Sequence, residues 1–122
     1  MTDAVNPKDL IGDTKPGLKH VPVLPLYLMG EVMDTGAAKY GPFNWREHPV
    51  REDVYIDAAL RHLFALREGQ VHDEDSGLPH AAHVMACMSI ILDADACGRL
   101  KRSTEPSMSH VFTDYLNEET AP

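Results

Sequence analysis

The chain has 122 residues, 43% of them hydrophobic and 25% charged, with a formal net charge of −8 and a pI near 5.2. This length supports one domain with a single core, and the composition is typical of a globular protein rather than a disordered one. The acidic balance excludes a broad basic surface for nucleic acid or anionic lipid. We therefore expect one domain over residues 1–122 and no nucleic-acid partner.

We expect neither a membrane span nor a secretory leader. The longest apolar runs are far shorter than the roughly 20 residues of a membrane helix. The N-terminus has no charged lead followed by an apolar segment. Cys87 and Cys97 fall in one apolar helical run, where about 15 Å of helix would separate them, too far for a disulfide. Reduced thiols predict a cytoplasmic location, the host cytoplasm if the chain is phage-encoded.

Residues 1–21 contain two prolines and two glycines, which predicts an irregular arm and not a helix. Lys15 in this arm is a candidate contact for a phosphate, and an ordinary solvated lysine is the alternative. We expect the core of the domain to lie between about residues 12 and 100.

From Pro25 the pattern becomes helical, with apolar residues at helical spacing to about Lys39. Glu31 and Asp34 are three positions apart on this helix, so both carboxylates project from one side. Oxygen ligands of this kind bind Mg²⁺ or Mn²⁺. A solvent-facing acidic pair is the alternative interpretation.

Gly41 and Pro42 end this helix, and the stretch KYGPFNWREHP is expected to form a loop. It contains the only tryptophan of the chain, Trp45, next to Asn44. An aromatic ring beside an amide can stack on a nucleobase and bind its edge. The alternative is a tryptophan that closes the mouth of the hydrophobic core.

Two apolar helical runs, at 53–69 and 81–93, are joined by the short acidic segment QVHDEDSGLPH. A connection this short makes the two helices antiparallel neighbours. In the second run, the apolar positions from Val84 to Leu92 are expected to form the buried stripe. Polar residues interrupt the apolar faces, and we expect them to meet at one end of the interface between the two helices. The alternative is that Asp57 and Arg61 form a surface ion pair and that the histidines pack at the helix edges. These residues are Asp57, Arg61, His62, His80 and His83.

The second helix of this hairpin should end at about residues 96–98. Residues 101–122 form a linker and tail, in which the apolar positions within 111–116 predict one short helix capped by Ser107 or Ser109. Alternating β-branched runs are absent from the sequence. The predicted fold class is therefore all-α, with three main helices, an irregular N-terminal arm and a short C-terminal helix.

Two well-known catalytic motifs are missing, which limits the reactions that the chain could catalyse. The sequence has no GxxxxGK[ST] phosphate loop and no HExxH zinc-protease motif. What remains is a set of carboxylates and histidines spread over three helices. Such a set suits metal-assisted hydrolysis, in which divalent ions polarise a phosphoryl group and activate water.

Three strings carry a family resemblance: GAAKYGPFNWRE at 36–47, YIDAALRHLFALREG at 55–69 and DSGLPHAAHVMAC at 75–87. Over roughly residues 12–95 the chain resembles the phage dATP/dGTP diphosphohydrolase N-terminal family, which is grouped with the all-α, MazG-like nucleotide pyrophosphohydrolases. The resemblance implies a helical bundle that forms a homo-oligomer, a dimer or tetramer. It also implies two or three Mg²⁺ or Mn²⁺ ions and attack of water on the α-phosphoryl group of a nucleoside triphosphate.

The implied substrate is a purine (d)NTP, preferentially dGTP or GTP. The products would be the monophosphate and pyrophosphate, so that dGMP is supplied for phage DNA containing 2-aminoadenine. MazG enzymes bind metal through EExxE and ExxD motifs, and neither string occurs here, although two histidines share the spacing of ExxD. We expect metal binding by Glu31, Asp34, Asp57 and His80, catalysis by His62 and His83, and substrate binding by Lys15, Lys39, Asn44, Trp45, Arg61 and Asp75.

Two other classes of protein remain open. The adjacent His72 and Asp73 suggest an HD-type dNTP triphosphohydrolase, which would release the whole triphosphate. The chain is short for that fold, and the dipeptide falls in a turn. The second alternative is a helical oligomer without turnover, which either binds nucleotides or is purely structural.

Overall fold

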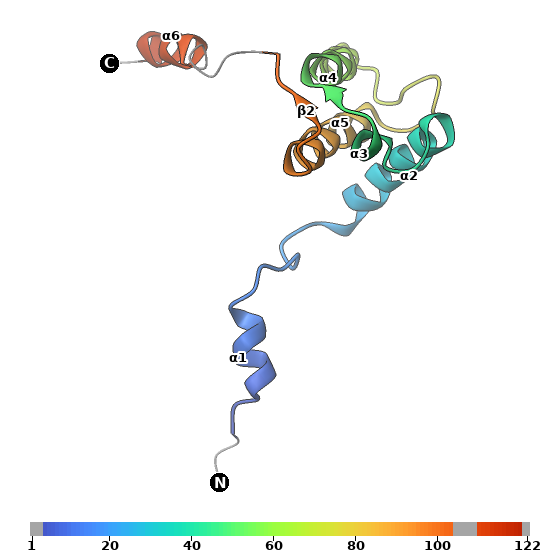
Figure 1. Cartoon of the computed structure of the whole chain (residues 1–122). Coiled ribbons are helices and arrows are strands. Elements are labelled where there is room, and N and C mark those ends of the chain that lie inside the picture. Colours follow the sequence, from blue (N-terminus) through green and yellow to red (C-terminus); the bar gives the residue numbers. More distant parts are fainter. Residues whose placement is uncertain (1–3, 104–109, 121–122) are drawn as a thin grey trace.

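The computed structural model describes residues 4–103 and 110–120 of the chain (Figure 1). Three helices are long, and these are α2 (Val23–Tyr40), α4 (Glu52–Arg67) and α5 (His80–Ala96). The shorter elements are α1 (Pro7–Asp13), α3 (Asn44–Glu47), α6 (Val111–Thr120) and the two-residue strands β1 (Val50–Arg51) and β2 (Leu100–Lys101). The predicted all-α class and its three main helices are confirmed.

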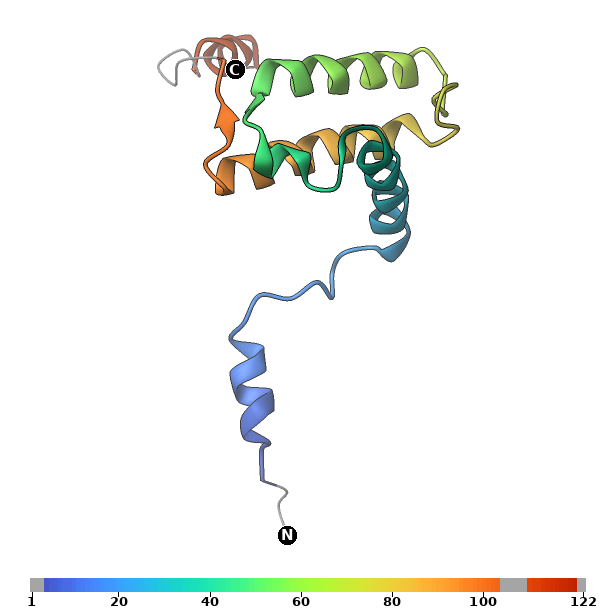
Figure 2. The same ribbon diagram turned by 45° about the vertical axis from the view of Figure 1, so that its right-hand side comes forward.

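Helix α5 is the centre of the bundle, because both α4 and α2 pack against it. Figure 2 shows α4 and α5 as antiparallel neighbours, with α2 crossing α5 near its N-terminal half. The antiparallel hairpin follows from the short connection between the two helices. Within the described part of the chain, none of the helices combines the length and apolar composition needed to cross a bilayer.

The buried core consists of small side chains. Four of its five apolar residues are alanines, and Ala82 and Ala86 of α5 pack with Val32 of α2. The predicted buried stripe of α5 is wrong at Leu92, which is 71% exposed, because α5 turns its alanines and His80 inward. Large apolar side chains on α4 are also left partly exposed.

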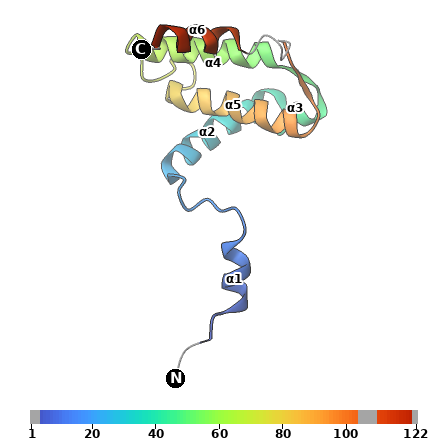
Figure 3. The same ribbon diagram turned by 90° about the vertical axis from the view of Figure 1, so that its left-hand side faces the viewer.

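The N-terminal arm contains a short helix, so the prediction of an arm without helix is wrong for Pro7–Asp13. The side chain of Asn6 accepts a hydrogen bond from the backbone N–H of Lys8 at 2.9 Å, and Pro7 occupies the first helical turn, where its missing N–H is harmless. The cap by Asn6 and the position of Pro7 favour the helix more than Gly12 disfavours it. Residues 4–21, the described part of the arm, include no buried residue and run away from the bundle (Figures 1 and 3).

The predicted loop after α2 contains one turn of helix, α3, followed by β1. Strand β1 pairs with β2 in parallel, with Val50 opposite Leu100, and so joins the start of α4 to the end of α5. The predicted C-terminal helix is confirmed as α6, whereas its proposed caps Ser107 and Ser109 lie outside the described residues.

Helix α3 is attached to α5 through Asp93. The indole N–H of Trp45 donates to Asp93 Oδ2 at 2.7 Å, and the Arg46 guanidinium donates to both carboxylate oxygens at 2.7 and 3.0 Å. The hydrogen bond from Arg46, followed by that from Trp45, lowers the pKa of Asp93 from 3.8 to about 2. Asp93 thus holds the aromatic ring of α3 against the end of α5.

The depressed pKa of Asp93 predicts a pH-dependent contribution to stability. The folded-state pKa lies below the unfolded one, so this stability is present above about pH 4 and is lost as the pH falls towards 2. Asp93→Asn should lower the melting temperature at pH 7, and the difference from wild type should shrink between pH 4 and pH 2. Circular dichroism melting curves over this range test it, with Glu47→Gln as an exposed control in α3. An equal loss at every pH would contradict it.

Candidate functional site

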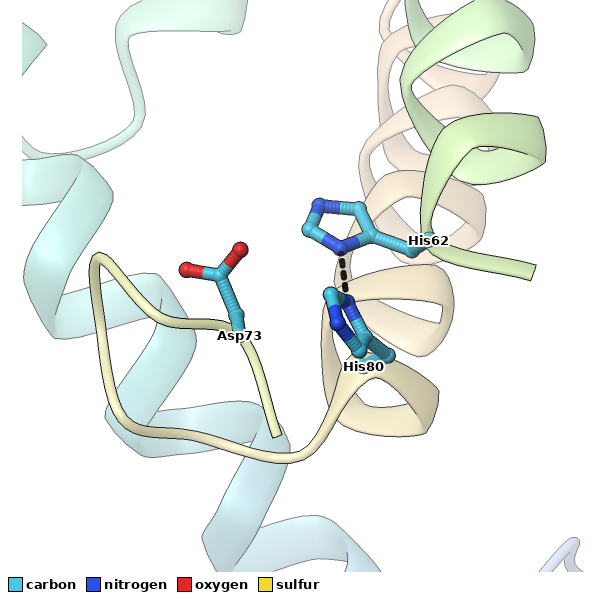
Figure 4. Close-up of side chains that lie close together, drawn as sticks. All are labelled: His62, Asp73 and His80. Atoms are coloured by element: carbon cyan, nitrogen blue, oxygen red, sulfur yellow. Dashed lines mark hydrogen bonds between the residues drawn. The ribbon is translucent and has the colours of Figure 1, made fainter. Parts of the chain in front are cut away.

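Histidines from two helices meet a carboxylate at one end of the α4–α5 hairpin. His62 comes from α4, and His80 and His83 come from the first turn of α5. Asp73 reaches the same place from the connecting loop (Figure 4). These four residues, with Ser76 of the loop, are called the histidine cluster below.

Backbone hydrogen bonds give the loop its shape. Asp73 donates to the carbonyl of Leu78 and accepts from Gly77, both at 2.8 Å, and His80 donates to the carbonyl of Val71 at 2.9 Å. Gly77 has φ +73°, a left-handed conformation that glycine adopts without strain. The loop is therefore folded back on the start of α5 and brings Asp73 and Ser76 against its histidines.

The imidazole rings are in direct contact. Nδ1 of His62 lies 2.8 Å from Nδ1 of His80, so one nitrogen must donate and the other accept. The ring of His62 also stacks on that of His83, with centroids 4.3 Å apart and planes within 8°. Nε2 of His83 lies 2.7 Å from the Ser76 hydroxyl and 3.9 Å from Asp73 Oδ2.

The environment favours the neutral form of His62 and His83 and the charged form of Asp73. Burial lowers the pKa of His62, and the neighbouring His83 and His80 lower it further. Burial also lowers the pKa of His83, against the opposing effect of Asp73. The backbone N–H of Ser76 donates to Asp73 at 2.9 Å and holds the pKa of its carboxyl below the ordinary value. At neutral pH these groups present lone pairs and one negative charge.

His80 is the most deeply buried member, with 6% of its surface exposed. Its Nε2 atom has no hydrogen-bond partner within the described part of the chain. Buried polar atoms are normally paired, and leaving one unsatisfied costs about 1–3 kcal/mol. This nitrogen therefore indicates a group that the protein chain itself does not supply.

A pocket of about 450 Å³ opens beside the cluster, between α2, α3 and α5. This volume lies within the range of small-molecule sites, about 300–1,000 Å³. Asn44 and Trp45, two predicted substrate contacts, line it. His83 lines it as well and so joins the pocket to the histidine cluster.

The carboxylates predicted to bind metal lie elsewhere. Glu31 and Asp34 are exposed on α2, where both line a shallow hollow, and Asp34 also lines the main pocket. Asp57 is exposed on α4. Among the described residues, these three do not share a close ligand group with His80.

The residues predicted to contact the phosphates are not members of the histidine cluster. Lys39 forms an ion pair with Asp75 at 3.7 Å, and both side chains are largely exposed. Its charge acts on His83, and the charge of Arg61 acts on His62, in each case lowering the pKa of the imidazole after the effect of burial. Lys15 is exposed in the arm between α1 and α2.

Sequence reasoning missed Asp73 and Ser76 as members of a site shared with the histidines. The signal was present, because an acidic residue three positions before Ser76, followed by Gly77, is a common turn pattern. Asp93 was not among the predicted site residues, because its bond to Trp45 depends on the packing of α3 against α5.

Comparison with known proteins identifies the family. The model of the family "dATP/dGTP diphosphohydrolase, N-terminal" matches residues 5–104. A curated relative, the dATP/dGTP diphosphohydrolase of Salmonella phage PMBT28, is 33% identical over 63 residues. That match covers 52% of this chain and 21% of the relative, so it spans about a fifth of the relative's length. No solved structure matches the chain. Since the family model covers most of the sequence, the chain belongs to the dATP/dGTP diphosphohydrolase N-terminal family.

Proposed function

We propose that this protein hydrolyses purine ribo- and deoxyribonucleoside triphosphates to the monophosphate and pyrophosphate in a metal-dependent reaction, with dGTP or GTP preferred. The family and the name of the phage relative support this substrate class. The observation that carries the proposal is His83, which lines a pocket of nucleoside size and also belongs to the histidine cluster. His83 thus connects a binding pocket to imidazole groups that can accept or donate protons. The dGMP formed would supply phage DNA that contains 2-aminoadenine.

The pocket suits a purine base because aromatic side chains form part of its wall. Tyr40, Trp45 and Tyr55 line it together with aliphatic residues of α2 and α5. The Trp45 ring is held by its bond to Asp93, which restricts its orientation before a ligand arrives. Asn44 offers an amide donor and acceptor for the edge of the base.

The triphosphate would extend from the pocket past His83. Lys39 and Arg61 lie close enough to the histidines to affect their pKa, and they would neutralise phosphate oxygens. Lys15 would reach the phosphates from the arm. Asp75 now holds Lys39, and we propose that it positions this lysine.

Neutral His62 and His83 would orient the attacking water and accept its proton. The stacking of the two rings and the bond from Ser76 to His83 fix their positions. Bound Mg²⁺ or Mn²⁺, two or three ions, would polarise the α-phosphoryl group and lower the pKa of the water. Glu31 and Asp34, on one face of α2, offer oxygen ligands that fit these ions, and Asp57 and His80 are the other proposed ligands.

We also propose a homo-oligomer, a dimer or tetramer, that buries the outer face of α4. A folded monomer of 13.5 kDa is expected to expose about 6,500 Å², whereas this chain exposes 9904 Å². The excess of roughly 3,400 Å² includes the N-terminal arm, which runs away from the bundle, so the argument for an interface is the set of exposed apolar side chains on α4. Ile56, Leu60, Leu63 and Phe64 of α4 are 38–58% exposed and form an apolar surface on that face.

Product analysis tests the reaction. Each dNTP and NTP is incubated with the protein and Mg²⁺ or Mn²⁺, and we expect monophosphate and pyrophosphate, most from dGTP. His83→Gln should lower kcat by about 10²-fold or more, because it removes the proton acceptor. Release of inorganic triphosphate would instead indicate the HD-type reaction suggested by His72 and Asp73. Nucleotide binding without turnover would indicate a non-catalytic module, and absence of binding a structural one.

Trp45→Ala should raise KM for dGTP roughly tenfold or more, because stacking on one base contributes about 1–3 kcal/mol. The effect on kcat should be smaller. Trp45→Phe keeps an aromatic face but loses the bond to Asp93, and it should retain most of the affinity. Steady-state kinetics on the two variants separate stacking from the anchoring of α3. Equal KM values for the two variants would exclude a stacking role.

Light scattering coupled to gel filtration tests the assembly. Wild type should elute as a dimer or tetramer, and the double variant Leu60→Glu/Leu63→Glu should elute as a monomer, because two buried charges would oppose association. Leu92→Glu is the matched control, since Leu92 is apolar and 71% exposed on α5. A monomeric wild type, or dissociation by the control alone, would contradict the α4 interface.

A further inference from the structure

His62, Asp73 and His80 have the geometry of a metal site, and of these three only His80 is among the metal ligands proposed above. One ligand atom from each residue lies within 4.8 Å of those of the other two. They come from α4, the connecting loop and the start of α5, so three separate segments of the chain converge on one point. Figure 4 shows the three side chains directed towards a shared space.

The spacing is compatible with an ion after a small movement. Metal–nitrogen and metal–oxygen bonds of about 2.0–2.2 Å place neighbouring ligand atoms roughly 3.4 Å apart in a tetrahedral site. The 2.8 Å separation between the two Nδ1 atoms would have to widen by about half an ångström. His62 is partly exposed, so its ring has room to turn.

The burial of His80 is the second, independent observation. This side chain is more than nine-tenths buried, and its Nε2 atom has no partner in the described structure. Direct contact between the two imidazoles uses only one nitrogen of each ring. A cation bound at the Nδ1 atoms would replace this contact by stronger metal–nitrogen bonds, and Nε2 of His80 would then need a separate partner such as a buried water.

The donor set determines which ion fits. Two imidazole nitrogens with one carboxylate oxygen suit first-row transition metals such as Mn²⁺, Fe²⁺, Co²⁺ and Zn²⁺, whereas Mg²⁺ favours oxygen ligands. Three protein ligands leave at least one coordination position open for water or a phosphate oxygen, as in catalytic sites. Asp73 supplies the single negative charge, and the N–H of Ser76 fixes its carboxylate.

We propose that His62, Asp73 and His80 bind one divalent transition-metal ion at the N-terminal end of α5, in preference to Mg²⁺. The binding itself does not depend on the proposed function. If that function holds, His62 would hold this ion instead of accepting a proton, and the ion would supply Lewis-acid chemistry beside His83. His83 would keep its proposed role as the proton acceptor, and Ser76 would act as a positioning residue, because its N–H holds Asp73.

The metal content of the full chain tests this proposal without any nucleotide. Protein stripped with chelator is dialysed against Mn²⁺, Co²⁺ or Zn²⁺ in a large excess of Mg²⁺, and the bound metal is measured by mass spectrometry. We expect about one transition-metal ion per chain. The Co²⁺ form should show visible absorption bands and a raised melting temperature.

Asp73→Asn is the decisive variant, because the amide can still accept the N–H of Ser76 but has no charge. It should weaken binding of Co²⁺ at least about tenfold. His62→Gln should do the same at a partly exposed position, which avoids disturbing the buried His80. Glu74→Gln, a neutralising change at an exposed residue of the same loop, should leave the affinity unchanged.

Three results would overturn the proposal: no retained metal, full displacement by Mg²⁺, or unchanged affinity in both ligand variants. Its failure can be told apart from failure of the proposed function. Metal binding without dNTP hydrolysis keeps the site and removes the enzyme. Hydrolysis of dNTP with Mg²⁺ by wild-type protein that retains no transition metal keeps the enzyme and removes the site.

Discussion

Close packing of α5 through alanines is the constraint on which the site depends. Ala82 and Ala86 are buried against α2, and Ala59 is the buried residue of α4. His62 follows Ala59 by three positions, so the two share the face of α4 that meets α5. Because small side chains let helices approach closely, the imidazole of His62 can touch that of His80 directly. A larger residue at Ala59 would separate the rings.

The loop between α4 and α5 adds a carboxylate and a hydroxyl to the histidines that the two helices bring together. Its hydrogen bonds to the start of α5, and the left-handed Gly77, fold it back so that Asp73 and Ser76 face the histidines. The cluster therefore combines imidazole rings with one carboxylate, a combination that can bind a cation or transfer a proton. His83 connects this chemistry to the pocket behind it, whose aromatic wall is held in place by Asp93.

A core built from alanines also has an energetic consequence. Alanines bury little apolar area, and hydrophobic stabilisation scales with the area removed from water. Within the described residues, no large side chain is fully buried, and apolar residues of α4 remain partly exposed. The same packing that brings the histidines together therefore leaves the outer face of the hairpin available to a second chain. This is why we place the proposed interface on the exposed apolar side chains of α4.

Sequence alone determined the helices, because apolar periodicity, prolines and turn residues act locally. Local patterns predicted the hairpin, the long helix before it and the short tail helix, and the family motifs were visible in the sequence. Helix α1 was missed, because its cap by Asn6 stands among prolines and glycines that are typical of irregular segments. Only the tertiary structure decided which polar residues meet. Asp73 lies beside His62 and His80, whereas Glu31 and Asp57 are exposed on α2 and α4. The rotation of each helix and the path of the loop are set by packing on α5, and the spacing of residues in the sequence does not reveal them.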